Sequence, residues 1–211
     1  MMKGAIFDVD GTLLDSMTMW YDVTERFFQQ NHLILDEATA LSFQEMTLEE
    51  SLPFMIEHYG LKKTFDQLRA EFYKMVEEEY AFHIPLKPYA KEYLYKLKSE
   101  GVKLAIATSS YEYLCKSALQ RLGVWELFDA IALSSQVGVN KTNPDVYLLA
   151  AQRIGVPPEE CVVFEDILAG LEGAKKAGMQ VVAVEDATNA HIRTALKANA
   201  HRYISSWKEL L

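Results

Sequence analysis

The sequence is poor in cysteine, has no run of basic residues and has no long hydrophobic segment. Its two cysteines, Cys115 and Cys161, are far apart and in apolar surroundings, so the sequence indicates buried thiols and excludes a disulfide framework or a cysteine-ligated metal. A formal net charge of −9 disfavours binding to nucleic acid or to an anionic membrane. Because no apolar stretch resembles a signal peptide or a membrane span, we expect a cytoplasmic protein.

Short apolar runs alternate with helical patterns along most of the 211 residues. The runs predict strands at 3–7, 102–108, 130–133, 161–165, 180–184 and 202–204. The patterns predict helices at 89–100, 111–122, 145–154, 168–177 and 187–198, with Asn143 and Pro144 starting the third. This alternation predicts an α/β fold in which a parallel sheet is flanked by helices.

The interval between the first two strands interrupts that alternation. It lacks a convincing strand and contains helical patterns, one of which begins with a Thr64 and Gln67 capping box. Aromatic and apolar side chains, including Tyr21 and Phe27, predict a separate small core. We therefore predict an α/β core domain of residues 1–15 and 87–211 and a helical cap domain of residues 16–86. Two connections between them form a hinge, so the cap can act as a lid.

The most informative feature is a pair of aspartates that follows the first strand. Asp8 and Asp10 share one face of an extended segment, and Gly11 then allows a sharp turn. Two carboxylates held this close repel each other unless a cation or a shared proton intervenes. The pair therefore favours a Mg²⁺ site with a carboxylate nucleophile, although a polar turn after a strand is the simpler alternative.

Polar residues also follow three other predicted strands. Thr108 and Ser109 stand at a strand end that leads into a helix start, where an anion would meet free N–H groups. Lys141 precedes another helix start, and Glu165 and Asp166 end a buried strand. Because ligands bind at the carboxyl ends of parallel strands, these residues are expected to form one site.

The motifs resemble those of the haloacid dehalogenase superfamily, whose members include aspartyl-phosphate phosphatases and phosphomutases. The string DVDGTLLDS at residues 8–16 resembles the first motif, and Thr108, Lys141 and Asp166 match the second, third and fourth in order. The resemblance covers nearly the whole chain. It implies a Rossmann-like sheet, an inserted helical cap and a hydrolase that acts on a small phosphorylated metabolite.

The resemblance also implies roles for these residues. Asp8 would be the nucleophile and Asp10 the general acid and base. Mg²⁺ would be bound by Asp8, the Asp10 carbonyl and Asp166, and Glu165 would tune the ion from beside these ligands. Substrate phosphate would be held by Thr108, Ser109 and Lys141.

Some positions depart from the family pattern and favour a phosphatase over a sugar-phosphate mutase. Trp20 stands where β-phosphoglucomutases have a histidine, Leu48 lies near the place of an arginine that grips phosphate, and Tyr111 and Glu112 replace a lysine and asparagine pair. A second phosphate therefore has no evident binding residues. A mutase remains the alternative, together with a non-catalytic interaction protein on the same fold. Dehalogenation is disfavoured because that reaction does not need Asp10.

The substrate and the oligomeric state are not identified by these patterns. In this architecture the leaving group faces the cap, so we expect cap side chains such as Trp20, Phe43, Met46 and Leu48 to affect which phosphoester is preferred. The loops around Tyr111 and Glu112 are the alternative source of specificity.

Overall fold

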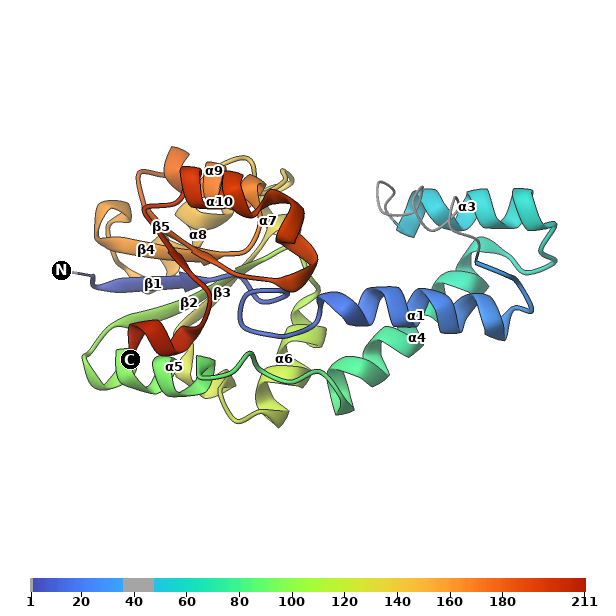
Figure 1. The fold of residues 1–211 in the computed structure, drawn as a ribbon, viewed down its shortest axis with the longest axis horizontal. Coiled ribbons are helices and arrows are strands. Elements are labelled where there is room, and N and C mark those ends of the chain that lie inside the picture. The colour runs from blue at the N-terminus through green and yellow to red at the C-terminus, as the bar shows by residue number, and fades with distance from the viewer. Residues whose placement is uncertain (1, 36–47) are drawn as a thin grey trace. The chain divides into compact units, whose positions relative to one another are not determined.

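A computed structural model describes residues 2–35 and 48–211 of the chain, which divide into two compact units (Figure 1). An α/β unit consists of Met1–Met17 and Tyr80–Leu211, and a helical unit consists of Thr18–Glu79. The sequence-based limits of a core domain and a cap domain, at residues 15/16 and 86/87, stay a prediction. Among the described residues, no helix combines the length and the apolar character needed to cross a membrane.

Six parallel strands form one sheet in the α/β unit, in the order β3-β2-β1-β4-β5-β6. The central strand, β1, is buried along its whole length, as expected for a parallel strand covered on both faces. The predicted parallel sheet is confirmed, and each strand lies within one residue of its predicted limits. The strands are β1 (Gly4–Phe7), β2 (Lys103–Thr108), β3 (Ala130–Leu133), β4 (Cys161–Glu165), β5 (Gln180–Val184) and β6 (Arg202–Ile204).

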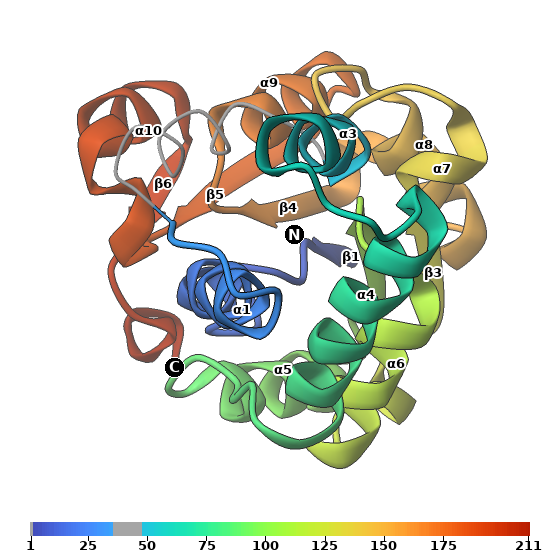
Figure 2. The ribbon, with the colours of Figure 1, turned by 90° about the vertical axis from the view of Figure 1, so that its right-hand side faces the viewer.

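Helices cover both faces of this sheet. One face carries α8 (Asp145–Ile154), α9 (Leu168–Lys176) and α10 (Arg193–Asn199), and the other carries α5 (Ala90–Ser99) and α6 (Glu112–Arg121). Figure 2 shows the same separation, with α8 and α9 above the strands and α5 below them. Short helical segments complete the unit: α7 (Ser134–Val137), η1 (Trp125–Leu127), η2 (Pro158–Glu160), η3 (Ala187–Ile192) and η4 (Trp207–Leu210).

Apolar side chains from strands and helices fill the space on both sides of β1. The rings of Phe7 and Phe164 stack with centroids 4.7 Å apart, and the Trp207 ring lies 5.2 Å from Phe164. Cys115 and Cys161 are free and buried, which confirms the expectation of buried thiols. This packing fixes the ends of β1 and β4 relative to each other.

The helical unit contains α1 (Met17–Gln30), α3 (Leu48–Tyr59) and α4 (Phe65–Phe82), the first and last of which extend into the α/β unit. Its core includes Phe27 and Phe72, whose rings meet edge to face at 5.4 Å. The predicted capping box is confirmed, because the Thr64 N–H donates to Gln67 Oε1 at 2.9 Å and the Gln67 N–H donates to Thr64 Oγ1 at 3.3 Å. Tyr21 is 58% exposed and so lies outside this core.

Three residues expected to influence substrate choice cannot be placed in this unit. Phe43 and Met46 lie outside the described residues, and of Leu48 the structure describes the main chain alone. Trp20 lies on α1 and is partly exposed.

Two predicted helix limits in the α/β unit were wrong. The segment predicted as one helix at 187–198 is η3 followed by α10, because Asn189 leaves the helical conformation (φ −92°, ψ 15°) and uses its side chain elsewhere. The N-cap of α8 is Pro144 rather than Asn143. The Asn143 side chain donates to Asn140 Oδ1 at 3.1 Å instead.

A buried ion pair fastens the chain between α4 and α5 to the end of β5. Lys87 Nζ lies 2.9 Å from Asp186 Oδ2 and donates to the Glu185 carbonyl at 2.6 Å. The Asp186 carboxylate also accepts from the Thr188 hydroxyl at 2.5 Å. Burial alone would raise the pKa of Asp186, but the Thr188 hydrogen bonds and the Lys87 charge lower it below 3.8.

We expect Asp186→Asn to reduce the free energy of unfolding by roughly 1.5–3 kcal/mol at neutral pH, the range for hydrogen bonds to charged groups. The pKa of Asp186 is lower in the folded state than in the unfolded state. The contribution of its carboxylate to the free energy of unfolding is therefore complete above the unfolded-state pKa and is lost as the pH falls through the folded-state pKa. The difference between the wild type and the variant should therefore shrink below about pH 4. Urea unfolding across this pH range measures it.

Glu172→Gln is a matched control, because the Lys176–Glu172 pair is exposed, with side-chain exposures of 48% and 58%. It should change stability by less than about 0.5 kcal/mol. An Asp186→Asn effect that did not depend on pH would contradict a role for the carboxylate charge.

Candidate active site

The carboxyl ends of three adjacent strands carry the polar residues that the sequence singles out. Asp8 directly follows β1, and its N–H donates to the Phe164 carbonyl of β4 at 3.0 Å. Thr108 ends β2 on one side of β1, and Glu165 ends β4 on the other side. The parallel arrangement therefore brings residues that are far apart in sequence to one edge of the sheet.

Lys141 joins two of these strand ends through its ammonium group. Its Nζ donates to Asp8 Oδ1 and, at 2.6 Å, to Glu165 Oε1. All three side chains are buried. Burial alone would lower the pKa of Lys141, but the charges of Asp8 and Glu165 raise it above its usual value, so the ammonium stays charged.

Glu165 is fully buried, yet one of its oxygens has no hydrogen-bond partner. Tyr147 donates to Oε1 at 2.8 Å, whereas Oε2 has no partner among the described residues. Burial raises the pKa of Glu165, and the negative charge of Asp8 raises it further, against the lowering effect of Lys141. A buried carboxylate oxygen without a partner costs free energy, so a cation near it would be stabilising.

Two glycines of α9 make room for this arrangement. A Cβ atom at Gly170 would lie 2.2 Å from the Glu165 carboxylate carbon, and one at Gly173 would lie 2.0 Å from the Lys141 carbonyl oxygen. Any larger residue would therefore displace the carboxylate or the loop that carries the lysine. The two glycines allow α9 to pack directly behind the charged groups.

Asp166 is held by donors on both carboxylate oxygens. Thr12 donates to Oδ1 at 3.1 Å, and the Asn189 amide donates to Oδ2 at 2.9 Å. The second bond explains why Asn189 interrupts the predicted helix. Burial raises the pKa of Asp166, and the neighbouring charge of Asp8 adds to this effect.

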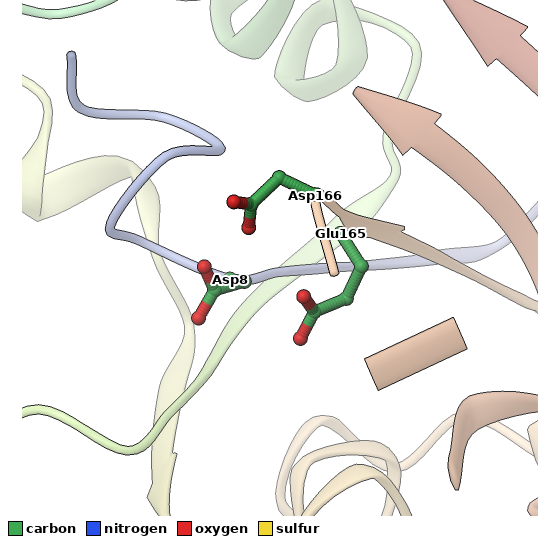
Figure 3. A group of neighbouring side chains, drawn as sticks. All are labelled: Asp8, Glu165 and Asp166. Carbon is green, nitrogen blue, oxygen red and sulfur yellow. The ribbon is translucent and has the colours of Figure 1, made fainter. Parts of the chain in front are cut away.

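Three buried carboxylates could hold a metal ion. Asp8, Glu165 and Asp166 each place one oxygen within 4.8 Å of the others, and Figure 3 shows their side chains turned toward the same space from the ends of β1 and β4. Lys141 supplies one positive charge against these three acids. A divalent cation fits, because it would offset the negative charge of the three carboxylates that Lys141 alone does not balance.

Asp10 lies two residues beyond Asp8 and has different neighbours. Its Oδ1 accepts hydrogen bonds from Ser16 Oγ at 2.7 Å and from the Tyr80 hydroxyl at 2.6 Å. Burial raises the pKa of Asp10 to about 6, and the charge of Asp8 adds to this, against the lowering effect of the two hydrogen bonds. A carboxyl group with such a pKa can give and take a proton near neutral pH.

The two remaining predicted site residues end the neighbouring strand and begin the loop after it. Thr108 is buried, and its hydroxyl accepts from the Ser110 N–H at 3.0 Å. Ser109 is exposed, with its hydroxyl oxygen 3.0 Å from that of Ser134. Their proposed role in binding phosphate stays a prediction.

The sequence alone does not identify several residues of the site. Tyr80, Tyr147 and Asn189 come from helices or irregular segments whose local patterns predict packing. Gly170 and Gly173 are recognisable in the sequence. Glycine inside a helical pattern costs stability, and two glycines three positions apart share one helix face, which indicates close packing there.

Comparison with known proteins identifies the family. The profile of haloacid dehalogenase-like hydrolases matches residues 5–184. The chain belongs to this family. A phosphorylated carbohydrates phosphatase of Thermotoga maritima is 30% identical over 179 residues, which are 85% of this chain and 83% of that protein.

Two further proteins are similar to this haloacid dehalogenase-like hydrolase over most of its length. The fructose-1-phosphate phosphatase YqaB of Escherichia coli is 30% identical over 190 residues, covering 86% of this chain and 95% of its own. A crystal structure of a β-phosphoglucomutase-like protein from Thermotoga maritima superposes with a TM-score of 0.87, at 28% identity and with both chains fully covered.

These comparisons confirm the predicted superfamily, the fold class and the assignment as a phosphomonoester hydrolase. The alternative of a non-catalytic interaction protein is not supported. The roles of individual site residues are considered below.

We expect Gly173→Ala to lower both stability and activity. In an open helical position this change would stabilise by about 1 kcal/mol. Here the new methyl group would collide with the Lys141 carbonyl, so we expect a loss of about 1–3 kcal/mol and a displaced Lys141. Urea unfolding and phosphate release measure the two effects.

Glu172→Ala is the control, because it changes the neighbouring and exposed position of the same helix. It should leave both quantities nearly unchanged. Equal stability and activity in the two variants would show that the Lys141 loop tolerates a side chain at position 173.

Proposed function

We propose that this protein is a Mg²⁺-dependent phosphatase that hydrolyses a small phosphomonoester through a phosphorylated Asp8. The observation that carries the proposal is the buried Lys141 ammonium shared by Asp8 and Glu165, with Asp10 two residues further along. In this proposal Asp8 would act as the nucleophile, Lys141 would bind phosphoryl oxygens and Asp10 would donate the proton, all at one edge of the sheet. Family membership and the phosphatases among the relatives support the same reaction.

In the first half-reaction, an Asp8 oxygen attacks phosphorus and the bond from phosphorus to the leaving oxygen breaks. Asp10 gives its proton to that oxygen. Thr108, the Ser109 N–H and Lys141 bind the non-bridging oxygens while negative charge is redistributed.

In the second half-reaction, Asp10 takes a proton from a water molecule whose oxygen attacks phosphorus. The bond from phosphorus to Asp8 breaks and inorganic phosphate leaves. Asp10 then carries a proton again and Asp8 is an anion, so the site returns to its starting state.

The acidic cluster supplies the metal ligands in this proposal. Asp8, the Asp10 carbonyl and Asp166 would hold Mg²⁺, and Glu165 would tune the site from beside them. When bound, the ion reduces repulsion between the nucleophile and the phosphate and orients both. Thr12 and Asn189 fix the Asp166 carboxylate so that it is ready for this role.

The relatives support one substrate class for this protein. The phosphatases of Thermotoga maritima and Escherichia coli described above act on phosphorylated carbohydrates, so a sugar phosphate is the first class to test. We further propose that residues 16–86 act as a cap whose side chains, Trp20 among them, influence the preferred leaving group.

A sugar-phosphate mutase is the second candidate, favoured by the structural likeness to a β-phosphoglucomutase-like protein. Tyr111 and Glu112 replace the lysine and asparagine pair that would bind a second phosphate in a mutase. Their presence therefore favours hydrolysis. Accumulation of a sugar bisphosphate during turnover would identify a mutase, whereas release of inorganic phosphate from a panel of phosphomonoesters would identify a phosphatase.

We expect Asp8→Asn to abolish turnover while the protein remains folded. The amide is nearly isosteric with the carboxylate but is a poor nucleophile. Quenching the wild type during turnover of a ³²P-labelled ester should leave label on the protein, and the variant should retain none. Asp22→Asn, an exposed isosteric change, is the control. Normal turnover by folded Asp8→Asn would exclude the covalent mechanism.

We also expect Mg²⁺ to raise the melting temperature, because a ligand that binds the folded state stabilises it by about 2.7 kcal/mol at 100 times its dissociation constant. Asn189→Leu removes a donor from Asp166 and should weaken Mg²⁺ binding by about 10- to 100-fold. Asn199→Leu is the control, since Asn199 is exposed and bonds to Ala195 instead. A melting temperature that does not respond to Mg²⁺ would contradict the metal site.

A further inference from the structure

Two hydroxyl groups bind the same oxygen of Asp10. The Tyr80 hydroxyl donates to Oδ1 at 2.6 Å and Ser16 Oγ donates to it at 2.7 Å. Tyr80 and Ser16 are both 0% exposed. Because a carboxylate oxygen has two lone-pair directions, these donors occupy both directions of Oδ1.

Tyr80 is itself held by the main chain around it. Its carbonyl accepts from Arg121 Nη2 at 3.3 Å, and the same nitrogen donates to the Ile84 carbonyl at 2.5 Å. The last turn of α4, which carries Tyr80, therefore belongs to the α/β unit and is fastened to α6. A buried ring anchored in this way keeps its hydroxyl in one position.

We propose that Tyr80 is a positioning residue that, together with Ser16, fixes Asp10 through Oδ1 and leaves Oδ2 as the oxygen that exchanges the proton. This inference rests on the proposed function of Asp10. As the bond from phosphorus to the leaving oxygen breaks, the proton on Oδ2 passes to that oxygen, and Oδ2 later takes a proton from the attacking water. Among the described residues, no hydrogen bond reaches Oδ2, so it is available for both transfers.

The geometry predicts a specific kinetic defect in Tyr80→Phe, which keeps the ring and removes the hydroxyl. With one donor lost, the Asp10 carboxyl group can rotate, and protonation of the leaving group becomes inefficient. A poor leaving group depends on that proton, whereas a nitrophenolate does not. We expect kcat/KM for alkyl phosphates to fall about 10- to 100-fold, part of the 10²–10⁴-fold that a general acid contributes, with a much smaller loss for nitrophenyl phosphate.

The experiment measures kcat/KM, which reports the transfer to Asp8, for a series of aryl and alkyl phosphates with Mg²⁺ present. The slope of log kcat/KM against leaving-group pKa should be steeper in Tyr80→Phe than in the wild type. Tyr93→Phe is the control, because Tyr93 is also buried but contacts the rings of Phe164 and Trp207. Its slope should match that of the wild type.

A purely structural hydroxyl would give a different result. An unchanged slope in Tyr80→Phe, or an equal loss on every ester, would overturn the proposal. If Tyr80→Phe does not fold, Ser16→Ala can replace it, because this change removes the other donor to Asp10 Oδ1. The slope should then be steeper in Ser16→Ala than in the wild type, and an unchanged slope would overturn the proposal.

The same series includes Asp10→Asn, which separates this inference from the proposed function. A steep slope in Asp10→Asn with a wild-type slope in Tyr80→Phe overturns the positioning role alone. A wild-type slope in Asp10→Asn would show that Asp10 is not the general acid, and the positioning role of Tyr80 would then be excluded as well.

Discussion

The constraint on which the rest of the structure depends is the balance of buried charge at the end of β1 and β4. Asp8, Glu165 and Asp166 are buried within a few ångströms of one another, and Lys141 is their one ammonium partner among the described residues. Such a group is costly unless each charge is paired or binds a cation. The parallel sheet, the close approach of α9 at its two glycines and the donors on Asp166 all hold these acids close together at one edge of the sheet.

Much of this could be read from the sequence, because strand ends are marked by local patterns. Short apolar runs predict the strand limits to within a residue, and the rule that ligands bind at the carboxyl ends of parallel strands predicts that Asp8, Lys141 and Asp166 lie close together. The fold class needed no more than this, since alternating strands and helices have few other solutions.

The remaining contacts depend on tertiary packing and leave little local trace. Tyr80 reaches Asp10 across 70 positions of sequence, and the helical pattern around it gives no sign of a polar role. Asn189 broke a predicted helix because a hydrogen bond to Asp166 outweighs the weak helical preference of a few residues. The anchoring of Tyr80 to Arg121 through the Tyr80 carbonyl, 41 positions apart in sequence, leaves no local pattern either.

The central position of β1 has a consequence for how the site is assembled during synthesis. Gly4 pairs with Lys103 on one side and with Cys161 on the other, so the first strand to be made must wait for two strands made much later. At the usual rate of translation this delay is on the order of 10 s. Throughout it, Asp8 and Asp10 remain hydrated on an unpaired segment. The segment that carries Asp8 is therefore synthesised before the two strands that bury it, and its folded environment forms only after β4 has been made.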